Sequence, residues 1–176
     1  YGLSVVYAQD GDAAQAYAEA QKAVQMAGRN DVFLQKNLLQ TRYALAADKK
    51  PVLKEISALA NDNPLSVMLA KIYIEDLYEQ GMHEEILKYL KGQSAISQDN
   101  ADYFRYLARS SEALGRRSEA FRATGKMYAL QGDWKMAAYQ FKQAQRVSDG
   151  DFFTMSEVDA DLREAEDHLK QDKSHN

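Results

Sequence analysis

The segment GRRSEAFRATGKMYALQGDWKMAAYQFKQAQ, residues 115–145, decides the fold. Gly115 and Gly132 mark two turns in it, and an amphipathic stretch of helical length lies between them. These glycines are only 17 residues apart, half the spacing of the turns elsewhere in the chain. We therefore expect the helix from about residue 118 to 130 to be the second helix of one hairpin and the first helix of the next.

Turn signals recur along the rest of the chain with a spacing close to 34 residues. They are Asp10–Asp12, Ala47–Lys49, Gln80–Met82 and Leu114–Arg116, and the turn at Gln131–Asp133 follows at half that spacing. A second class of break follows at Gly28–Asn30, Asn61–Pro64 and Gln98–Asn100. Because each turn separates two amphipathic stretches, the pattern predicts repeated units of helix, turn, helix and turn.

The composition favours helices and excludes several classes of protein. Only 2 prolines and 9 glycines occur among 176 residues, and 45% of the residues are hydrophobic, which is enough for a continuous core. The net charge of -4 lacks the basic footprint of a nucleic-acid binder. The chain contains no cysteine, which removes disulfides and cysteine-ligated metals, and no apolar run is long enough to insert into a membrane.

A helix-turn-helix unit with a period near 34 resembles the tetratricopeptide repeat (TPR). The residues that fall on its large and small positions are Leu3, Tyr7, Ala16 and Ala20 in the first unit; Leu39, Tyr43, Ile56 and Leu59 in the second; Tyr73, Leu77, Ile86 and Leu90 in the third; Phe104, Leu107, Ala120 and Met127 in the fourth; and Phe121, Tyr128, Ala137 and Phe141 in the overlapping fifth. Small residues allow two helices to approach closely, and large ones fill the seam between hairpins.

We therefore predict an all-α fold, a TPR-like helical-hairpin superhelix (α-solenoid) of about four and a half repeats with a C-terminal capping helix. The predicted parts are units at about 1–29, 30–64, 65–98 and 99–131, an overlapping fifth hairpin at 118–148, a capping helix at 151–169 and a polar tail at 171–176. Phe152, Phe153 and Val158 are expected on the apolar face of the capping helix.

Several segments resemble one family in particular. They are Tyr1–Leu3, Glu119–Asp133 and Ala144–Phe153, together with Val158–Ala160. They are similar to the C-terminal TPR domain of BepA-type zinc metalloproteases, which are bacterial periplasmic enzymes that act on outer-membrane β-barrel assembly. The family pattern has arginines where this sequence has Glu157 and Asp161.

The resemblance implies a periplasmic, non-catalytic domain that docks partners on its concave surface. The implied partners are proteins or peptides: the outer-membrane assembly machinery, β-barrel substrates and the chain's own protease domain. That domain is expected upstream of Tyr1, outside this sequence, and zinc is expected there. We expect no cofactor and no metal site in residues 1–176.

A search of the sequence for catalytic chemistry finds no constellation of residues. His83–Leu87 begins like a zinc-protease helix, His-Glu-x-x-His, but Leu87 stands where the second histidine is needed. His168 and His175 are isolated near the end of the chain, and acidic pairs such as Glu84–Glu85 are typical of solvated helix faces. This sequence is therefore predicted to be a binding module and not an enzyme.

The candidate partner-binding residues lie mainly on the first helices of the hairpins. They are Lys71, Tyr78, Arg105, Tyr106, Arg109, Arg122 and Lys126, and Leu38 and Thr41 are expected on the same inner wall. Arg105 and Arg109 share a helix face, and Arg122 and Lys126 repeat their spacing. Such a cationic strip with aromatic neighbours suits a carboxylate or an acidic peptide.

Other interpretations of the same residues stay open. The cations can instead pair with Asp102, Glu112 or Glu119 on a solvated surface. Tyr73 and Tyr128 fit core packing, whereas Tyr78 and Tyr106 fit the surface better. The alternative function is a free-standing TPR scaffold or adaptor with no attached enzyme. A chaperone adaptor is not expected, because Asn37, Lys71 and Arg105 do not reproduce the known carboxylate clamp.

Overall fold

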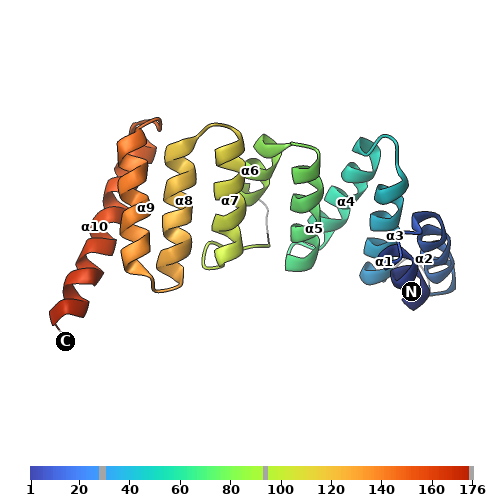
Figure 1. Ribbon diagram of the computed structural model, residues 1–176. Coiled ribbons are helices and arrows are strands. Elements are labelled where there is room, and N and C mark those ends of the chain that lie inside the picture. Colours follow the sequence, from blue (N-terminus) through green and yellow to red (C-terminus); the bar gives the residue numbers. More distant parts are fainter. Residues whose placement is uncertain (28–30, 93–94, 175–176) are drawn as a thin grey trace. The chain divides into compact units, whose positions relative to one another are not determined.

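The computed structural model describes residues 1–27, 31–92 and 95–174, which form ten helices and no strand (Figure 1). The helices are α1 (Gly2–Gln9), α2 (Ala13–Ala27), α3 (Val32–Leu45), α4 (Lys50–Asp62), α5 (Val67–Glu79), α6 (His83–Gly92), α7 (Ala101–Ala113), α8 (Arg117–Leu130), α9 (Trp134–Val147) and α10 (Phe152–Ser174). The predicted all-α fold is confirmed. The predicted break at Gly28–Asn30 lies outside the described residues.

Four of the predicted turns contain a glycine with left-handed backbone geometry. The φ angles are 80° at Gly11, 67° at Gly81, 74° at Gly115 and 77° at Gly132. Only glycine adopts this region without a steric penalty, so each of these residues ends a helix where the chain must reverse. The turn at Ala47–Lys49 has no glycine; there α3 ends at Leu45, and α4 begins at Lys50 with a proline in its first turn.

Short polar side chains fix where several helices begin. The Asp31 carboxylate accepts hydrogen bonds from the backbone N–H groups of Phe33 and Leu34, and Asn100 caps α7 in the same way through Asp102 N–H. Such caps satisfy backbone donors that have no partner within the helix. The second class of break predicted at Gln98–Asn100 thus corresponds to a capped helix start.

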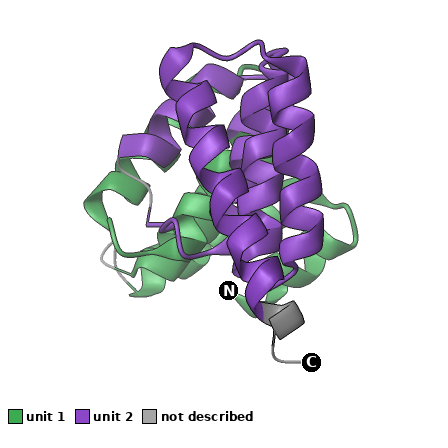
Figure 2. Cartoon of the chain, turned by 90° about the vertical axis from the view of Figure 1, so that its left-hand side faces the viewer, with its two compact units in different colours: residues 1–76 green, residues 77–176 purple. Residues whose placement is uncertain are grey.

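By its internal contacts the chain divides into two compact units, Tyr1–Asp76 (unit 1) and Leu77–Asn176 (unit 2), with the boundary inside α5 (Figure 2). In unit 1, α1 packs on α2, α2 on α3, and α3 on α4. Ala16 and Ala20 are buried in α2, which lets the neighbouring helices approach closely.

The expected position of Leu3 in the core of unit 1 is wrong. Leu3 is exposed, and the adjacent Ser4 is buried instead. The Ser4 hydroxyl donates to the Ala16 carbonyl at 2.7 Å and accepts from Asn37 Nδ2 at 2.9 Å. A small hydrogen-bonded residue therefore occupies the contact between α1, α2 and α3, and it turns the larger leucine outward.

In unit 2, α8 packs against both α7 and α9, and α10 packs against α9 and α8. Phe141 and Val158 are fully buried. Gly125 of α8 lies directly against Phe141, so that a Cβ atom at this position would come within 2.4 Å of the aromatic ring. The one helix between Gly115 and Gly132 thus contacts partners on two sides.

The last helix differs from its predicted form in two respects. It continues to Ser174, beyond the expected end at residue 169 and into the segment expected as a polar tail. Phe152 and Phe153 are exposed and do not belong to its buried face. They stand at the start of the helix, more than one turn before the buried residue Val158. His168 is not isolated: its ring stacks on Trp134 at a centroid distance of 3.8 Å.

No helix in the described part of the chain is both long enough and apolar enough to cross a membrane.

Candidate functional site

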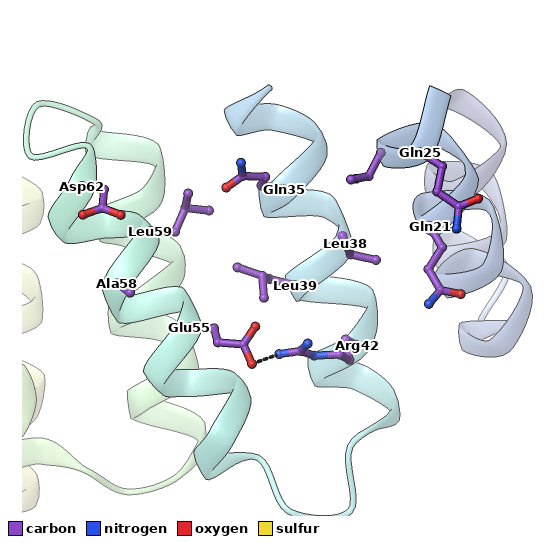
Figure 3. Close-up of a pocket in the computed structure, with 11 residues that line it drawn as sticks. Gln21, Gln25, Gln35, Leu38, Leu39, Arg42, Glu55, Ala58, Leu59 and Asp62 are labelled. Atoms are coloured by element: carbon purple, nitrogen blue, oxygen red, sulfur yellow. Dashed lines mark ion pairs between the residues drawn. The ribbon is translucent and has the colours of Figure 1, made fainter. Parts of the chain in front are cut away.

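A groove of about 790 Å³ runs over α3 in unit 1, between α2 and α4 (Figure 3). We call it the amide groove. Its lining residues are Gln21, Val24, Gln25, Gln35, Leu38, Leu39, Arg42, Glu55, Ala58, Leu59 and Asp62. A hollow of this volume lies within the range of ordinary ligand sites in proteins.

Each wall of the amide groove has its own chemistry. On α2, Gln21 and Gln25 stand one helical turn apart, and both contribute to the lining of the groove. Leu38 and Leu39 of α3 form an apolar floor, with Leu38 directed toward α2 and Leu39 toward α4 (Figure 3). Leu59 adds apolar surface from α4. The lining thus combines aliphatic side chains with uncharged amides.

The charges of the amide groove lie on its α4 side. Arg42 Nη2 contacts Glu55 Oε1 at 2.5 Å, which joins α3 to α4. Arg42 Nε is buried and has no hydrogen-bond partner. Asp62 lies two turns beyond Glu55 on α4, so one cation and two carboxylates line the groove (Figure 3). The lining therefore carries a net charge of about -1 at neutral pH.

A second hollow, in unit 2, is lined by equal numbers of cations and carboxylates. This charged cleft has a volume of about 480 Å³. Its charged lining residues are Lys91, Glu119, Arg122, Lys126, Asp151 and Glu157, and Gln98, Tyr103, Phe104, Leu107, Ala123, Phe153 and Thr154 complete it.

Two of the three cations that line the charged cleft, Arg122 and Lys126, pair with carboxylates of α10. Arg122 Nη1 contacts Glu157 Oε2 at 2.6 Å, and Arg122 Nε contacts Asp161 Oδ2 at 2.7 Å. Lys126 Nζ contacts Asp161 Oδ1 at 3.1 Å, and Asp161 is buried. Glu157 and Asp161 are the positions at which the BepA-type pattern has arginines. The carboxylates found there neutralise the pair expected to bind an acidic partner.

Tyr103 is a further buried group in the charged cleft that the sequence did not single out. Burial raises the pKa of its hydroxyl, while a hydrogen bond with Gln98 and the positive charge of Arg122 act in the opposite direction. The hydroxyl therefore stays protonated at neutral pH and adds no charge to the cleft.

The other residues of the predicted strip have contacts of their own. The Arg109 guanidinium lies 4.0 Å from the centre of the Tyr78 ring, and His83 packs edge-on against the same ring. Arg105 pairs with Asp102 at 2.9 Å, one of the acids named in the alternative interpretation. Lys71 lies on the part of α5 that belongs to unit 1.

Two expected surface residues are buried. Tyr106 is only 3% exposed, because α7 packs on both α6 and α8 and buries Tyr103 and Phe104 as well. Thr41 is also buried, and its hydroxyl donates to the Asn37 and Leu38 carbonyls. The expectation that Tyr106 and Thr41 lie on the surface requires each helix to have a single apolar face.

The residues of the α2 and α4 walls of the amide groove are not among the predicted binding residues, because those lie mainly on the first helix of each hairpin. Of the residues expected on the inner wall, Leu38 lines this groove, and Leu39 and Leu59, which were expected as repeat positions, line it as well. One signal was present in the sequence: Gln21 and Gln25 are neutral polar residues at helical spacing on a helix whose other exposed positions include charged ones. The two glutamines indicate a groove only once the structure places Leu39 and Leu59 in the same lining.

Within residues 1–27, 31–92 and 95–171, no group of three or more histidine, aspartate or glutamate side chains is placed to hold a metal ion. A scan of protein-family models gives no match to this chain, and a search of curated proteins finds none that matches.

Proposed function

We propose that this chain is a protein-binding module that holds a segment of another polypeptide in the amide groove. One observation carries the proposal: an open groove with an aliphatic floor and amide side chains on its wall, built on helices packed in pairs. Aliphatic surface supplies binding free energy, and the amides supply hydrogen bonds to a polypeptide backbone. Helical-hairpin scaffolds commonly act in this way.

The charged cleft is the weaker candidate for the binding site. Arg122 and Lys126 already contact Asp161, so an acidic ligand would have to displace an intramolecular carboxylate that is itself buried. Displacing it would leave that carboxylate without its partners, which is costly in a buried environment.

Site-specific photo-crosslinking tests the proposal. A photoreactive residue at Ala58, which lines the amide groove, is expected to give adducts with other polypeptides in intact cells. The same residue at Lys135, an exposed position on α9, serves as the control. Equal adduct yields at the two positions would overturn the proposal.

The resemblance to BepA-type TPR domains supports a narrower form of this proposal. In that form the module belongs to a periplasmic zinc metalloprotease and holds outer-membrane assembly components or β-barrel substrates. The same crosslinking experiment separates the two forms, because it identifies the captured proteins. Capture at Ala58 of cytosolic proteins alone would contradict the narrower form and favour a free-standing scaffold.

A further inference from the structure

We infer that the amide groove takes a polypeptide segment that is extended and uncharged, and that it recognises the backbone of this segment rather than acidic side chains. The inference rests on the proposed function and names the chemistry of the partner. It departs from the expectation drawn from the basic residues, which favoured an acidic peptide.

The glutamines indicate the conformation of the partner. A glutamine amide both donates and accepts hydrogen bonds, and the α2 wall carries two such groups, Gln21 and Gln25, one helical turn apart. Gln21 Nε2 donates to the Tyr17 hydroxyl at 3.0 Å, which uses one of the two N–H groups of that amide. An extended segment has backbone N–H and C=O groups that need partners, whereas a helix satisfies these groups internally. An amide-lined wall therefore favours an extended backbone over a helical one.

The charges of the groove argue against an acidic partner. The guanidinium of Arg42 is joined to Glu55, and Asp62 adds a second carboxylate on the same wall. A partner carboxylate near Arg42 would meet Glu55 as well, so attraction and repulsion largely cancel. At the Asp62 end nothing in the lining offsets the repulsion.

The floor of the groove argues against a strongly basic partner. Leu38, Leu39 and Leu59 offer aliphatic surface, on which a charged side chain would lose hydration; the carboxylates that could act as counter-ions lie on the α4 side. The only net charge is about one negative charge toward one end, which salt at physiological concentration screens strongly. Neutral side chains are therefore the ones this lining suits.

Fluorescence anisotropy of labelled synthetic peptides with the full chain tests the inference. The reference peptide is short and built from serine, threonine, valine and glutamine. Two matched peptides carry several glutamates or several lysines at the same positions, and a third carries N-methyl groups on alternate backbone nitrogens. A fourth is an amphipathic helix locked by a covalent staple.

The expected result is that the reference peptide binds at low and at high salt with little change in Kd. N-methylation should weaken binding at least about tenfold, because it removes backbone donors. The glutamate peptide should bind at least about tenfold more weakly at low salt, and the lysine peptide no more tightly than the reference at high salt.

Substitutions in the chain provide the second arm. Replacing both amides, Gln21→Leu with Gln25→Leu, keeps the bulk of the wall and should weaken the reference peptide about tenfold. The control is Gln15→Leu on the same helix, outside the groove lining, which should leave the Kd unchanged. Circular dichroism confirms that each variant is folded.

The outcomes separate the inference from the proposed function. Tighter binding of the glutamate peptide, tighter binding of the stapled helix, or equal binding of the N-methylated peptide overturns the inference and leaves a polypeptide-binding groove. If no peptide binds and Ala58 gives no more adducts than Lys135, the proposed function fails, and the inference fails with it.

Discussion

The amide groove of unit 1 and the charged cleft of unit 2 are both hollows between packed helices, but they use their polar side chains differently. In the charged cleft, Arg122 and Lys126 of α8 contact Asp161 of α10, so the charges hold two helices of the unit together. In the amide groove one exposed ion pair spans two helices, and the remaining lining is mostly amide and aliphatic.

The exposure of the two arginine pairs measures this difference. The side chains of Arg122 and Asp161 are 25% and 10% exposed, whereas those of Arg42 and Glu55 are 33% and 54% exposed. A buried carboxylate that loses its cation is left in a poorly hydrated environment, and an exposed one is rehydrated by water. Breaking an ion pair of the charged cleft should therefore cost more stability than breaking the ion pair of the amide groove.

Substitution at Gly125 should have the largest effect on the free energy of unfolding. It tests whether α8, which carries Arg122 and Lys126 of the charged cleft, packs tightly against α9. Gly125→Val places a Cβ atom against the buried ring of Phe141, so we expect a loss of about 3 kcal/mol in the free energy of unfolding. Urea unfolding followed by circular dichroism measures it. The control is Gly92→Val at the end of α6, where a Cβ atom meets nothing within 4 Å. Similar losses in both variants would mean that the contact of α8 with α9 is not tight.

Asp161→Asn tests the charges of the cleft directly. The substitution keeps the shape of the side chain and removes the charge that Arg122 and Lys126 share. We expect a loss of about 2 kcal/mol in the free energy of unfolding, which should shrink only modestly in high salt because the group is buried. Glu84→Gln, which breaks the exposed pair with Arg116, should cost about 0.5 kcal/mol or less. If Asp161→Asn and Glu84→Gln lower the free energy of unfolding by the same amount, burial does not make the ion pairs of the cleft stronger than an exposed pair.

Asp149 tests a different polar contact of unit 2, at the start of α8. Its carboxylate accepts from the backbone N–H groups of Arg117 at 2.9 Å and Ser118 at 2.7 Å. Burial alone would raise the pKa of Asp149, but hydrogen bonds with Ser118 and Arg117 lower it below its ordinary value of 3.8. The folded state therefore binds this proton less tightly than the unfolded state does.

The stabilisation from Asp149 is consequently complete above its ordinary pKa of 3.8 and is lost as the pH falls through the lower value of the folded state. Asp149→Ala should cost about 1 kcal/mol at neutral pH, as for other helix caps, and less below pH 3.8. The free energy of unfolding of the unsubstituted chain and of Asp149→Ala, measured from neutral pH to below pH 3.8, gives this cost at each pH. A difference that stays constant with pH would contradict the role of the carboxylate.

The parts of the fold that depend on local sequence were predictable. Gly81 and Gly115 ended helices because no other residue type adopts their backbone geometry easily, and Asn100 began one because its side chain caps free N–H groups. The error at Leu3 has a tertiary cause. The close contact of α1 with α2 requires a small residue, and local hydrophobicity favours the larger neighbour of Ser4.

The polar sites depend on pairings between distant residues, which the sequence pattern does not contain. Arg122 and Asp161 are 39 residues apart, and only the packing of α10 on α8 brings them together. Spacing alone placed Arg122 on a helix face with Lys126, but it could not identify the carboxylates opposite. The amide groove is hidden from a local search for the same reason, since α2, α3 and α4 each supply part of its lining.

Arg42→Gln should have the smallest effect on stability, and it completes the comparison because Arg122→Gln makes the same change in the charged cleft. We expect Arg42→Gln to change the free energy of unfolding by less than about 0.5 kcal/mol, since Glu55 is exposed and Arg42 Nε has no partner to lose. Arg122→Gln should cost about 1 kcal/mol or more, because Asp161 is buried. Urea unfolding of both variants, at low and high salt, measures the two costs. Equal costs would show that the two arginine pairs contribute equally to stability, and the exposure of its ion pair would then no longer distinguish the amide groove from the charged cleft.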